Sequence, residues 1–362
     1  MKFIDEYRDP KIAKGLVSAI KRRSERLKSN ISIMEVCGTH THSINRFGIK
    51  SLLPENVRLV SGPGCPVCVT SIQDIDRALF LAKEKGVIFT TFGDMMRVPG
   101  TDGASLEMMR SDGANIAVVS SPLNAVSLAE EKAEAEVVLL GIGFETTSPT
   151  VAAAVMSAKK RGLTNFSVFS VHKVIPPAIK ILLDDPKINV DGFLCPGHVS
   201  IILGAGAYSI IPEKGRAAVI TGFEPLDILE GILMTIDQIV EERFDVEIQY
   251  KRAVKEEGNP NARTVMDGVF DRANATWRGL GEIPESGLVF NSEHRSFDAL
   301  ERFNVPEIES KEDERCSCGE ILKGVMSPDE CPLFGSVCNP RNPVGPCMVS
   351  SEGACSAFYK YR

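Results

Sequence analysis

The sequence predicts an α/β protein: two similar domains with mainly parallel sheets, followed by a loop-rich C-terminal domain. Short β-branched runs alternate with helical stretches from Ser32 to about Phe223, which is the pattern of parallel α/β units. Beyond Glu224 the chain becomes charged and short of strand signals. Six of the ten cysteines lie from Cys316 onward, so the last segment differs in chemistry from the rest.

Composition narrows the class of protein. The chain has 362 residues, of which 43% are hydrophobic and 25% are charged, which is ordinary for a folded domain protein. The net charge of −7 and the absence of a long basic stripe argue against nucleic-acid binding. No apolar run approaches the roughly 18 residues of a membrane span, and the N-terminus lacks the apolar core of a signal peptide. We therefore expect a cytoplasmic protein with no membrane or nucleic-acid partner.

The expected elements follow the chain in order. Asp9 and Pro10 open a basic amphipathic helix, and Pro225 begins a long helix with leucines on one face. The Glu-rich span 307–315 is expected to be a solvated linker. Candidate strands are expected at residues 31–36, 57–61, 87–92, 116–120, 137–142, 166–171, 192–195 and 217–221.

These elements suggest three domains. The first would span 32–122, the second 123–223, and the third would combine 1–31 with 224–362. Three strand ends with Gly, Phe and a carboxylate, at 92–94, 143–145 and 222–224, hint that the two α/β domains are duplicates. The alternative is ordinary turn chemistry, in which Gly makes the turn and the carboxylate caps the next helix.

The segment 62–68, with the sequence GPGCPVC, places two thiols between an expected strand and an expected helix. Thr70 to Gln73 has the pattern of a capping box, so Cys65 and Cys68 would lie at a helix N-terminus. The positive end of the helix dipole there lowers a thiol pKa, which favours metal binding and redox chemistry. A lone CxxC is a weak signal, and two small buried residues of a turn are an equal alternative.

Two further strand ends combine thiol and imidazole groups. Residues 34–42 (MEVCGTHTH) place Cys37, His40 and His42 in one loop, and residues 194–198 (LCPGH) bring Cys195 and His198 to a tight turn. Cys and His are both ligands for iron or zinc. Ligands collect beyond the carboxyl ends of parallel strands, so these loops and the CxxC together indicate a site.

The C-terminal cysteines have the spacing C-x-C-x12-C-x6-C-x8-C-x7-C. Four thiolates hold either zinc or a [4Fe–4S] cluster. No pair of CxxC knuckles is present, so scattered cysteines in Gly/Pro loops favour the cluster, with two thiols left over. The nucleotide-binding and hydrolase motifs are absent: 141–146 lacks the third glycine of a dinucleotide fingerprint, and neither a P-loop nor a GxSxG elbow occurs.

Taken together, MEVCGTHTH (34–42), GPGCPVC (62–68), GFETTSP (143–149), CPGHVS (195–200) and the terminal CMVSSEGACSAFYKY (347–361) resemble the HypD family of hydrogenase maturation proteins. The resemblance spans nearly the whole chain. It implies a redox-active assembly scaffold rather than a conventional turnover enzyme. On such a scaffold the iron carrying cyanide and carbon monoxide for [NiFe] hydrogenases is built, with a HypC-type chaperone and a HypE-type cyanide donor as partners.

The resemblance also implies roles for single residues. Cys37 would hold the transient iron together with a cysteine of the chaperone, Cys65 and Cys68 would be a redox pair beside it, and His40 would line the site. Glu145 and His198, at other strand ends, would line a partner-docking cleft expected around Cys37 and the CxxC. The resemblance favours as [4Fe–4S] ligands Cys316, Cys331, Cys338 and Cys355, leaving Cys318 and Cys347 as a second thiol pair; which of Cys316 and Cys318 is a ligand stays open.

Two other functions fit the residues alone. One is an iron–sulfur thiol–disulfide reductase in which the cluster reduces the pair Cys65 and Cys68 for a protein substrate. The other is a zinc-stabilised binding module without electron chemistry. Protein colour separates the zinc module from the rest, and iron–cyanide infrared bands separate the scaffold from the reductase.

Overall fold

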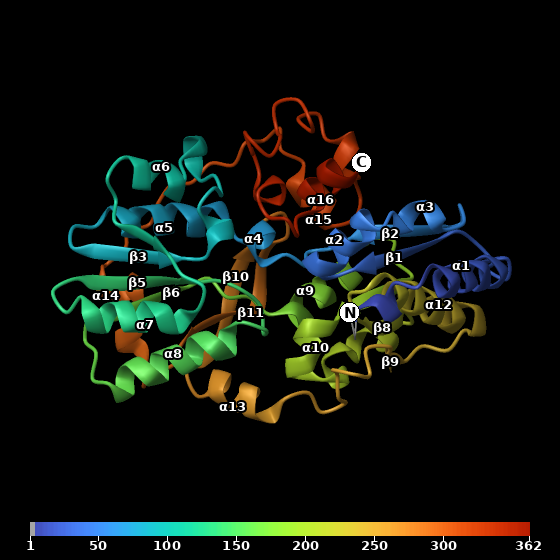
Figure 1. Ribbon diagram of the computed structural model, residues 1–362, viewed down its shortest axis with the longest axis horizontal. Helices are drawn as coiled ribbons and strands as arrows, with labels where there is room; N and C mark the ends of the chain where they lie inside the picture. Colours follow the sequence, from blue (N-terminus) through green and yellow to red (C-terminus); the bar gives the residue numbers. More distant parts are fainter. Residues whose placement is uncertain (1–3) are drawn as a thin grey trace.

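The computed structural model describes residues 4–362 and confirms the α/β class. Figure 1 shows two α/β lobes side by side, with the C-terminal segment lying above the junction between them. Each lobe contains one parallel sheet with helices against it, as expected for strands that are joined by helical crossovers. The carboxyl ends of these strands are where the cysteine and histidine loops begin.

The first sheet has the strand order β2-β1-β7-β8-β9, and all its pairs are parallel. Its inner strands β1, β7 and β8 are almost fully buried, because helices cover both faces. The strand β9 was not expected. The bounds are β1 (Ile31–Glu35), β2 (Val57–Ser61), β7 (Gly192–Pro196), β8 (Ala217–Thr221) and β9 (Val246–Ile248).

The second sheet has the order β4-β3-β5-β6 and is also parallel throughout. Its bounds are β3 (Val87–Thr91), β4 (Ile116–Val118), β5 (Glu136–Gly141) and β6 (Phe166–Ser170). All eight strands expected from the sequence are present, although β4 ends two residues earlier than expected. Local β-branched patterns are sufficient to find a strand, but they do not fix its partners.

The strands are grouped differently from the expected domains 32–122 and 123–223. The chain leaves the first sheet after β2, builds the whole second sheet, and returns to the first sheet at β7. The strand β1 therefore pairs with β2 on one side and with β7, more than 150 residues later, on the other. The boundary at 122 falls inside the second lobe, since sequence order alone does not reveal such a return.

Helices connect the strands of both sheets. Apart from short 3-10 turns, the remaining elements are α2 (Gly38–Arg46), α3 (Ile49–Leu52), α4 (Pro66–Val69), α5 (Ile72–Lys83), α6 (Leu106–Ser111), α7 (Pro122–Glu131), α8 (Ser148–Lys160), α9 (Ile175–Asp184), α10 (Gly197–Leu203), α11 (Ile210–Glu213), α13 (Pro260–Asp267), α14 (Ala299–Arg302), α15 (Cys318–Leu322) and α16 (Ala354–Tyr361).

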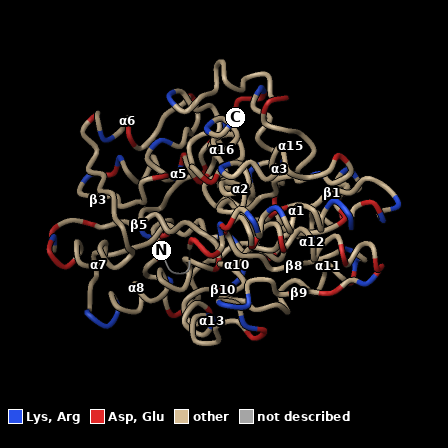
Figure 2. The backbone as a smooth tube through the Cα atoms, turned by 45° about the vertical axis from the view of Figure 1, so that its right-hand side comes forward, with Lys and Arg blue, Asp and Glu red and all other residues tan. Residues whose placement is uncertain are grey.

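The expected N-terminal helix and long helix pack against each other. These are α1 (Pro10–Ser24), capped by Asp9, and α12 (Pro225–Glu241), and both lie on the right of Figure 1. Ion pairs such as Arg23 with Asp237 and Lys28 with Glu242 join their polar sides. Figure 2 shows acidic and basic residues interspersed along the backbone.

A long antiparallel hairpin was missed by the sequence analysis, which expected few strands beyond Glu224. Its strands are β10 (Phe270–Trp277) and β11 (Gly281–Phe290). Its tip reaches the CxxC segment, where Arg278 N–H donates to the Val69 carbonyl at 2.9 Å. Trp277 is fully buried and stacks on Phe144 of the second lobe, with ring centroids 5.9 Å apart. Between Phe270 and Trp277 every residue of β10 is exposed or half-buried, so this strand lacks the alternating apolar pattern that would have predicted it.

Candidate functional site

Cys37 lies directly after β1 and is the N-cap residue of α2. Its side chain is 7% exposed, and its own N–H donates to Glu35 Oε2 at 3.1 Å. Burial raises the pKa of the Cys37 thiol to about 12, although backbone N–H groups of His40 and Thr39 oppose this rise. The thiol is therefore protonated as it stands, and a metal ion binding there would have to displace the proton.

The CxxC segment packs directly against Cys37. Gly38 N–H donates to the Gly64 carbonyl at 2.9 Å, and a Cβ atom on Gly64 would lie 2.1 Å from Cys37 N. Only glycine allows the two loops to approach this closely. Two strand ends that are adjacent in the first sheet thereby bring the loop that leads into Cys65 against Cys37.

The CxxC has its own one-turn helix, α4, with Cys65 as N-cap; Cys68 N–H donates to Cys65 Sγ at 3.3 Å. The expected capping box was wrong, because Ser71 rather than Thr70 caps α5, accepting from Asp74 N–H. The expected lowering of the thiol pKa was also wrong for Cys68. This thiol is fully buried, and loss of solvent raises its pKa well above the ordinary value.

A continuous row of thiols leads from the CxxC to the C-terminal segment. Cys68 and Cys347 hydrogen-bond through their side chains, and Cys347 Sγ lies 2.7 Å from Cys318 Sγ. Cys318 in turn contacts the thiol of Cys316. We call Cys68, Cys347, Cys318 and Cys316 the thiol row. All ten cysteines are free thiols, so these contacts are not disulfides.

Six cysteines line one small cavity in the C-terminal segment, together with apolar side chains such as Leu333 and Phe334. Four of them influence one another electrostatically: the pKa of Cys355 is raised by burial and by the nearby thiols of Cys338, Cys316 and Cys331. This donor set fits a [4Fe–4S] cluster, which takes four thiolates in an apolar surrounding. Within residues 4–362, no three His, Cys, Asp or Glu side chains are arranged to hold a metal ion as they stand.

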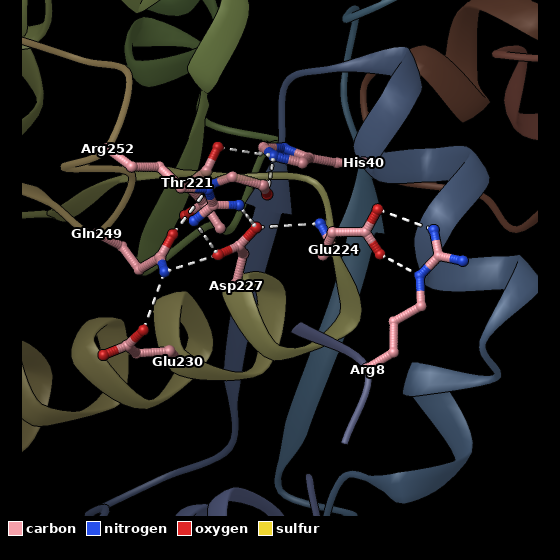
Figure 3. Close-up of polar contacts among 9 residues, drawn as sticks. Arg8, His40, Thr221, Glu224, Asp227, Glu230, Gln249 and Arg252 are labelled. Atoms are coloured by element: carbon pink, nitrogen blue, oxygen red, sulfur yellow. Dashed lines mark hydrogen bonds and ion pairs between the residues drawn. The ribbon is translucent and has the colours of Figure 1, made fainter. Parts of the chain in front are cut away.

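His40 lies in the first turn of α2 and points toward the end of β8. Its Nε2 is 3.1 Å from the Thr221 carbonyl oxygen and 2.9 Å from that of Gly222 (Figure 3). Burial lowers the pKa of His40 to about 4, so the ring is neutral near pH 7. The ring also packs against Phe223, with centroids 5.1 Å apart.

Comparison with known proteins identifies the family. A family model described as HypD, hydrogenase formation hypA family, matches residues 11–362. The chain belongs to the HypD family. It is 45% identical to hydrogenase maturation factor HypD2 of Bradyrhizobium diazoefficiens, over 100% of this chain and 97% of the relative. It is 44% identical to hydrogenase maturation factors HypD of Cupriavidus necator and Escherichia coli, over 100% of this chain and 97% and 98% of those proteins.

His198 and Glu145, which also belong to the HypD motifs, differ in how far they are buried. His198 is partly exposed at the start of α10 and stacks on Phe223 at 3.9 Å, so the same ring contacts both His198 and His40. Glu145 belongs to the second lobe and is fully buried. Its Oε1 accepts from Ile175 N–H, its Oε2 has no hydrogen-bond partner among the described residues, and burial raises its pKa to about 7.

The Tyr208 hydroxyl is affected by groups from both lobes. Burial raises its pKa well above the ordinary value, and the nearby groups Cys195, Glu145 and Cys37 raise it further. Glu145 and Cys37 therefore both lie within electrostatic range of one buried hydroxyl, although they belong to different sheets. Cys195 is buried, and no thiol contact accompanies its raised pKa.

The structure adds one residue of the HypD terminal motif that sequence reasoning did not single out. Glu352 is mostly buried against α2: Thr39 Oγ1 donates to its Oε1 at 2.7 Å, and a Cβ on Gly38 would meet its Cβ at 2.5 Å. Its charge is among the causes that raise the pKa of Cys37. Its place three residues before Cys355 was the available signal.

No helix within residues 4–362 combines the length and the apolar character needed to cross a membrane.

Proposed function

We propose that this member of the HypD family is the scaffold and redox protein on which the iron group of [NiFe] hydrogenases is assembled, with two cyanides and one carbon monoxide on iron. Family membership supports the maturation role. The observation that favours the redox role is the thiol row, which joins the CxxC beside Cys37 to the C-terminal cavity. The free cysteines suit a reducing compartment, so we propose a cytoplasmic location.

Cys37 would anchor the iron, which is the cargo of this protein. A soft thiolate suits low-spin iron, and the buried surroundings keep water from the cyanide ligands. A cysteine of a HypC-type chaperone would complete the attachment, and a HypE-type protein would deliver cyanide. We further propose that Glu145 and His198 serve the docking of these partners, His198 from its exposed position at the start of α10 and Glu145 from its buried position in the second lobe, with His40 beside the iron.

The thiols would exchange electrons by disulfide exchange along the row. A Cys347 thiolate attacks Cys68 of a Cys65–Cys68 disulfide, which forms a Cys68–Cys347 bond and releases Cys65 as thiolate. Cys318 then attacks Cys347, which releases Cys68. Two electrons pass from the pair Cys318 and Cys347, which becomes the disulfide, to the pair Cys65 and Cys68, and the two protons follow the thiolates. The contacts of Cys347 with Cys68 and with Cys318 support this order of exchange.

The C-terminal cavity would hold the resident cofactor through Cys316, Cys331, Cys338 and Cys355. A [4Fe–4S] cluster there supplies or accepts single electrons. The row thiols Cys318 and Cys347 line the same cavity and would lie beside a cluster held there.

The anchoring role is tested by infrared spectroscopy of anaerobically purified protein with its chaperone. We expect cyanide and carbonyl stretches on iron for the wild type, and their loss in Cys37→Ala with the cluster absorbance unchanged, because Cys37 is separate from the cluster thiols. Cys195→Ala is the matched control, since this thiol is buried but outside the row. Bands that survive in Cys37→Ala would contradict the assignment, and a wild type without bands would favour a reductase.

A further inference from the structure

The contacts of His40 fix which of its ring nitrogens has the proton. Nε2 faces two backbone carbonyl oxygens, Thr221 at 3.1 Å and Gly222 at 2.9 Å, and a carbonyl oxygen can only accept a hydrogen bond. In a neutral imidazole, Nε2 must therefore be the protonated nitrogen, and Nδ1 has a free lone pair. Nδ1 is buried and has no hydrogen-bond partner among the described residues. A buried acceptor without a donor calls for an explanation.

The two carbonyls are themselves held by a polar network (Figure 3). Gly222 N–H donates to Gln249 Oε1 at 3.0 Å, and Gln249 Nε2 donates to Asp227 Oδ1 at 3.1 Å and to Glu230 Oε2 at 2.9 Å. The loop that ends β8 is thus tied to the first turn of α12 through one glutamine side chain. Its backbone orientation depends on Gln249.

Asp227 is the centre of this network. It is 1% exposed, and it accepts from Glu224 N–H at 3.1 Å and from both terminal nitrogens of Arg252. A Cβ on Gly222 would lie 2.5 Å from Asp227 Oδ2, so the loop and the carboxylate are in close contact. This is more polar structure than capping α12 requires, since Glu224 and Asp227 alone complete the capping box.

We infer that Asp227, Gln249 and Arg252 are positioning residues that fix the Nε2–H tautomer of His40, so that the Nδ1 lone pair stays free for the group bound at Cys37. His40 lies three residues after Cys37 in the first turn of α2. A histidine used in a metal site commonly donates its second N–H to a backbone carbonyl, which sets its tautomer and ring orientation. The functional part of this inference rests on the proposed assembly site at Cys37.

The tautomer is tested without any cargo, by NMR of protein labelled with ¹⁵N in its histidine rings. His40→Gln identifies the His40 signals among the five histidines. We expect the wild type to show Nδ1 as an unprotonated nitrogen and Nε2 as a protonated one. Gln249→Leu and Asp227→Asn, which keep side-chain volume, should give a mixture of tautomers because the carbonyls lose their support. The opposite tautomer in the wild type would overturn the inference.

Arg8→Ala is the matched control, because Arg8 binds the carboxylate of Glu224 in the same network without touching the Thr221–Gly222 backbone. It should leave the His40 signals unchanged. If Gln249→Leu and Asp227→Asn both fold and leave the His40 signals as in the wild type, the network does not position His40. Two variants are used so that failure of one to fold does not remove the test.

Hydrogenase maturation in cells lacking the endogenous factor tests the functional part. Gln249→Leu should lower maturation about 10- to 100-fold, the usual cost of losing a residue that orients a metal-site group, and Arg8→Ala should not. An altered tautomer with unchanged maturation would refute the positioning role and leave the proposed function standing. Wild-type protein without iron–cyanide bands would instead refute the proposed function and leave the tautomer result standing.

Discussion

His172 illustrates how burial acts on a single side chain in this protein. The ring is 1% exposed, its Nδ1 contacts Ser170 Oγ at 3.1 Å, and its Nε2 has no hydrogen-bond partner among the described residues. Burial, followed by the charge of Lys173, lowers the pKa of His172 to about 3. The folded protein therefore keeps this ring neutral well below the pH at which an exposed histidine ionises.

This depressed pKa predicts an acid-sensitive contribution to stability. The unfolded chain binds a proton on His172 as the pH falls below about 6.5, whereas the folded chain does so only near pH 3. Stability is therefore lost as the pH falls through this window. We expect His172→Gln to reduce the loss of unfolding free energy between pH 7 and pH 5 by about 2 kcal/mol, measured by urea unfolding.

His294→Gln is the control for this measurement. His294 has its Nδ1 3.0 Å from Asn291 Oδ1, and burial lowers its pKa; unlike His172, it has no buried ring nitrogen without a hydrogen-bond partner among the described residues. Its replacement should change the difference between pH 7 and pH 5 much less. Equal pH dependence in the wild type and in His172→Gln would show that the imidazole takes up its proton without unfolding.

The thiol row makes a second prediction at the residue scale. Anaerobic reduction should increase the number of alkylatable thiols at Cys65 and Cys68, because in the proposed relay electrons reach them through Cys318 and Cys347. Cys347→Ser should block that increase, whereas Cys195→Ser should not. Mass spectrometry of alkylated peptides measures both. Identical labelling of Cys65 and Cys68 in Cys347→Ser and in the wild type would exclude the row as the route.

Among the elements, the hairpin β10–β11 links parts of the molecule that are far apart in sequence. Its tip contacts the CxxC segment through Arg278, and at Gly279 it meets α15, where a Cβ would lie 2.3 Å from Gly319 Cα. Gly319 follows Cys318, a member of the thiol row. The hairpin therefore positions one end of the row relative to the other.

Gly279 and Gly281 allow a matched test of this role. Both have φ of +78°, so alanine at either should cost about 1–2 kcal/mol of backbone strain. Only at Gly279 does the new methyl group meet another segment, whereas nothing lies within 4 Å at Gly281. We expect Gly279→Ala, but not Gly281→Ala, to increase the alkylation rate of Cys318 and Cys347. Equal rates in the two variants would show that the tip does not hold α15 in place.

At the scale of the whole molecule, the second lobe is inserted between β2 and β7 of the first. A fragment of residues 1–122 contains β1 without β7, and β3 without β5, so each sheet lacks an inner neighbour. We expect this fragment to give no cooperative unfolding transition by circular dichroism, in contrast to the full chain. A cooperative transition would show that residues 1–122 fold independently of the rest of the chain.

The sequence predicted much of the candidate site because its residues follow strands. Cys37 and the CxxC end neighbouring strands of one sheet, and parallel strands bring their carboxyl ends to one edge. The contact of Cys68 with Cys347 was not predictable in the same way, since a folded segment of loops decides it. The protonation of Cys68 was mispredicted because the helix dipole was considered without the burial that outweighs it.

The sequence by itself determined the α/β class, the positions of the eight expected strands and the assignment to the HypD family, because β-branched runs and motif spacing are local properties of the chain. Tertiary structure alone decided which strands pair, where the hairpin tip inserts, and that Glu352 covers α2 beside Cys37. It also decided the thiol contacts and the His40 hydrogen bonds. These depend on packing between segments separated by up to about 300 residues, and burial then sets the pKa of each group they enclose.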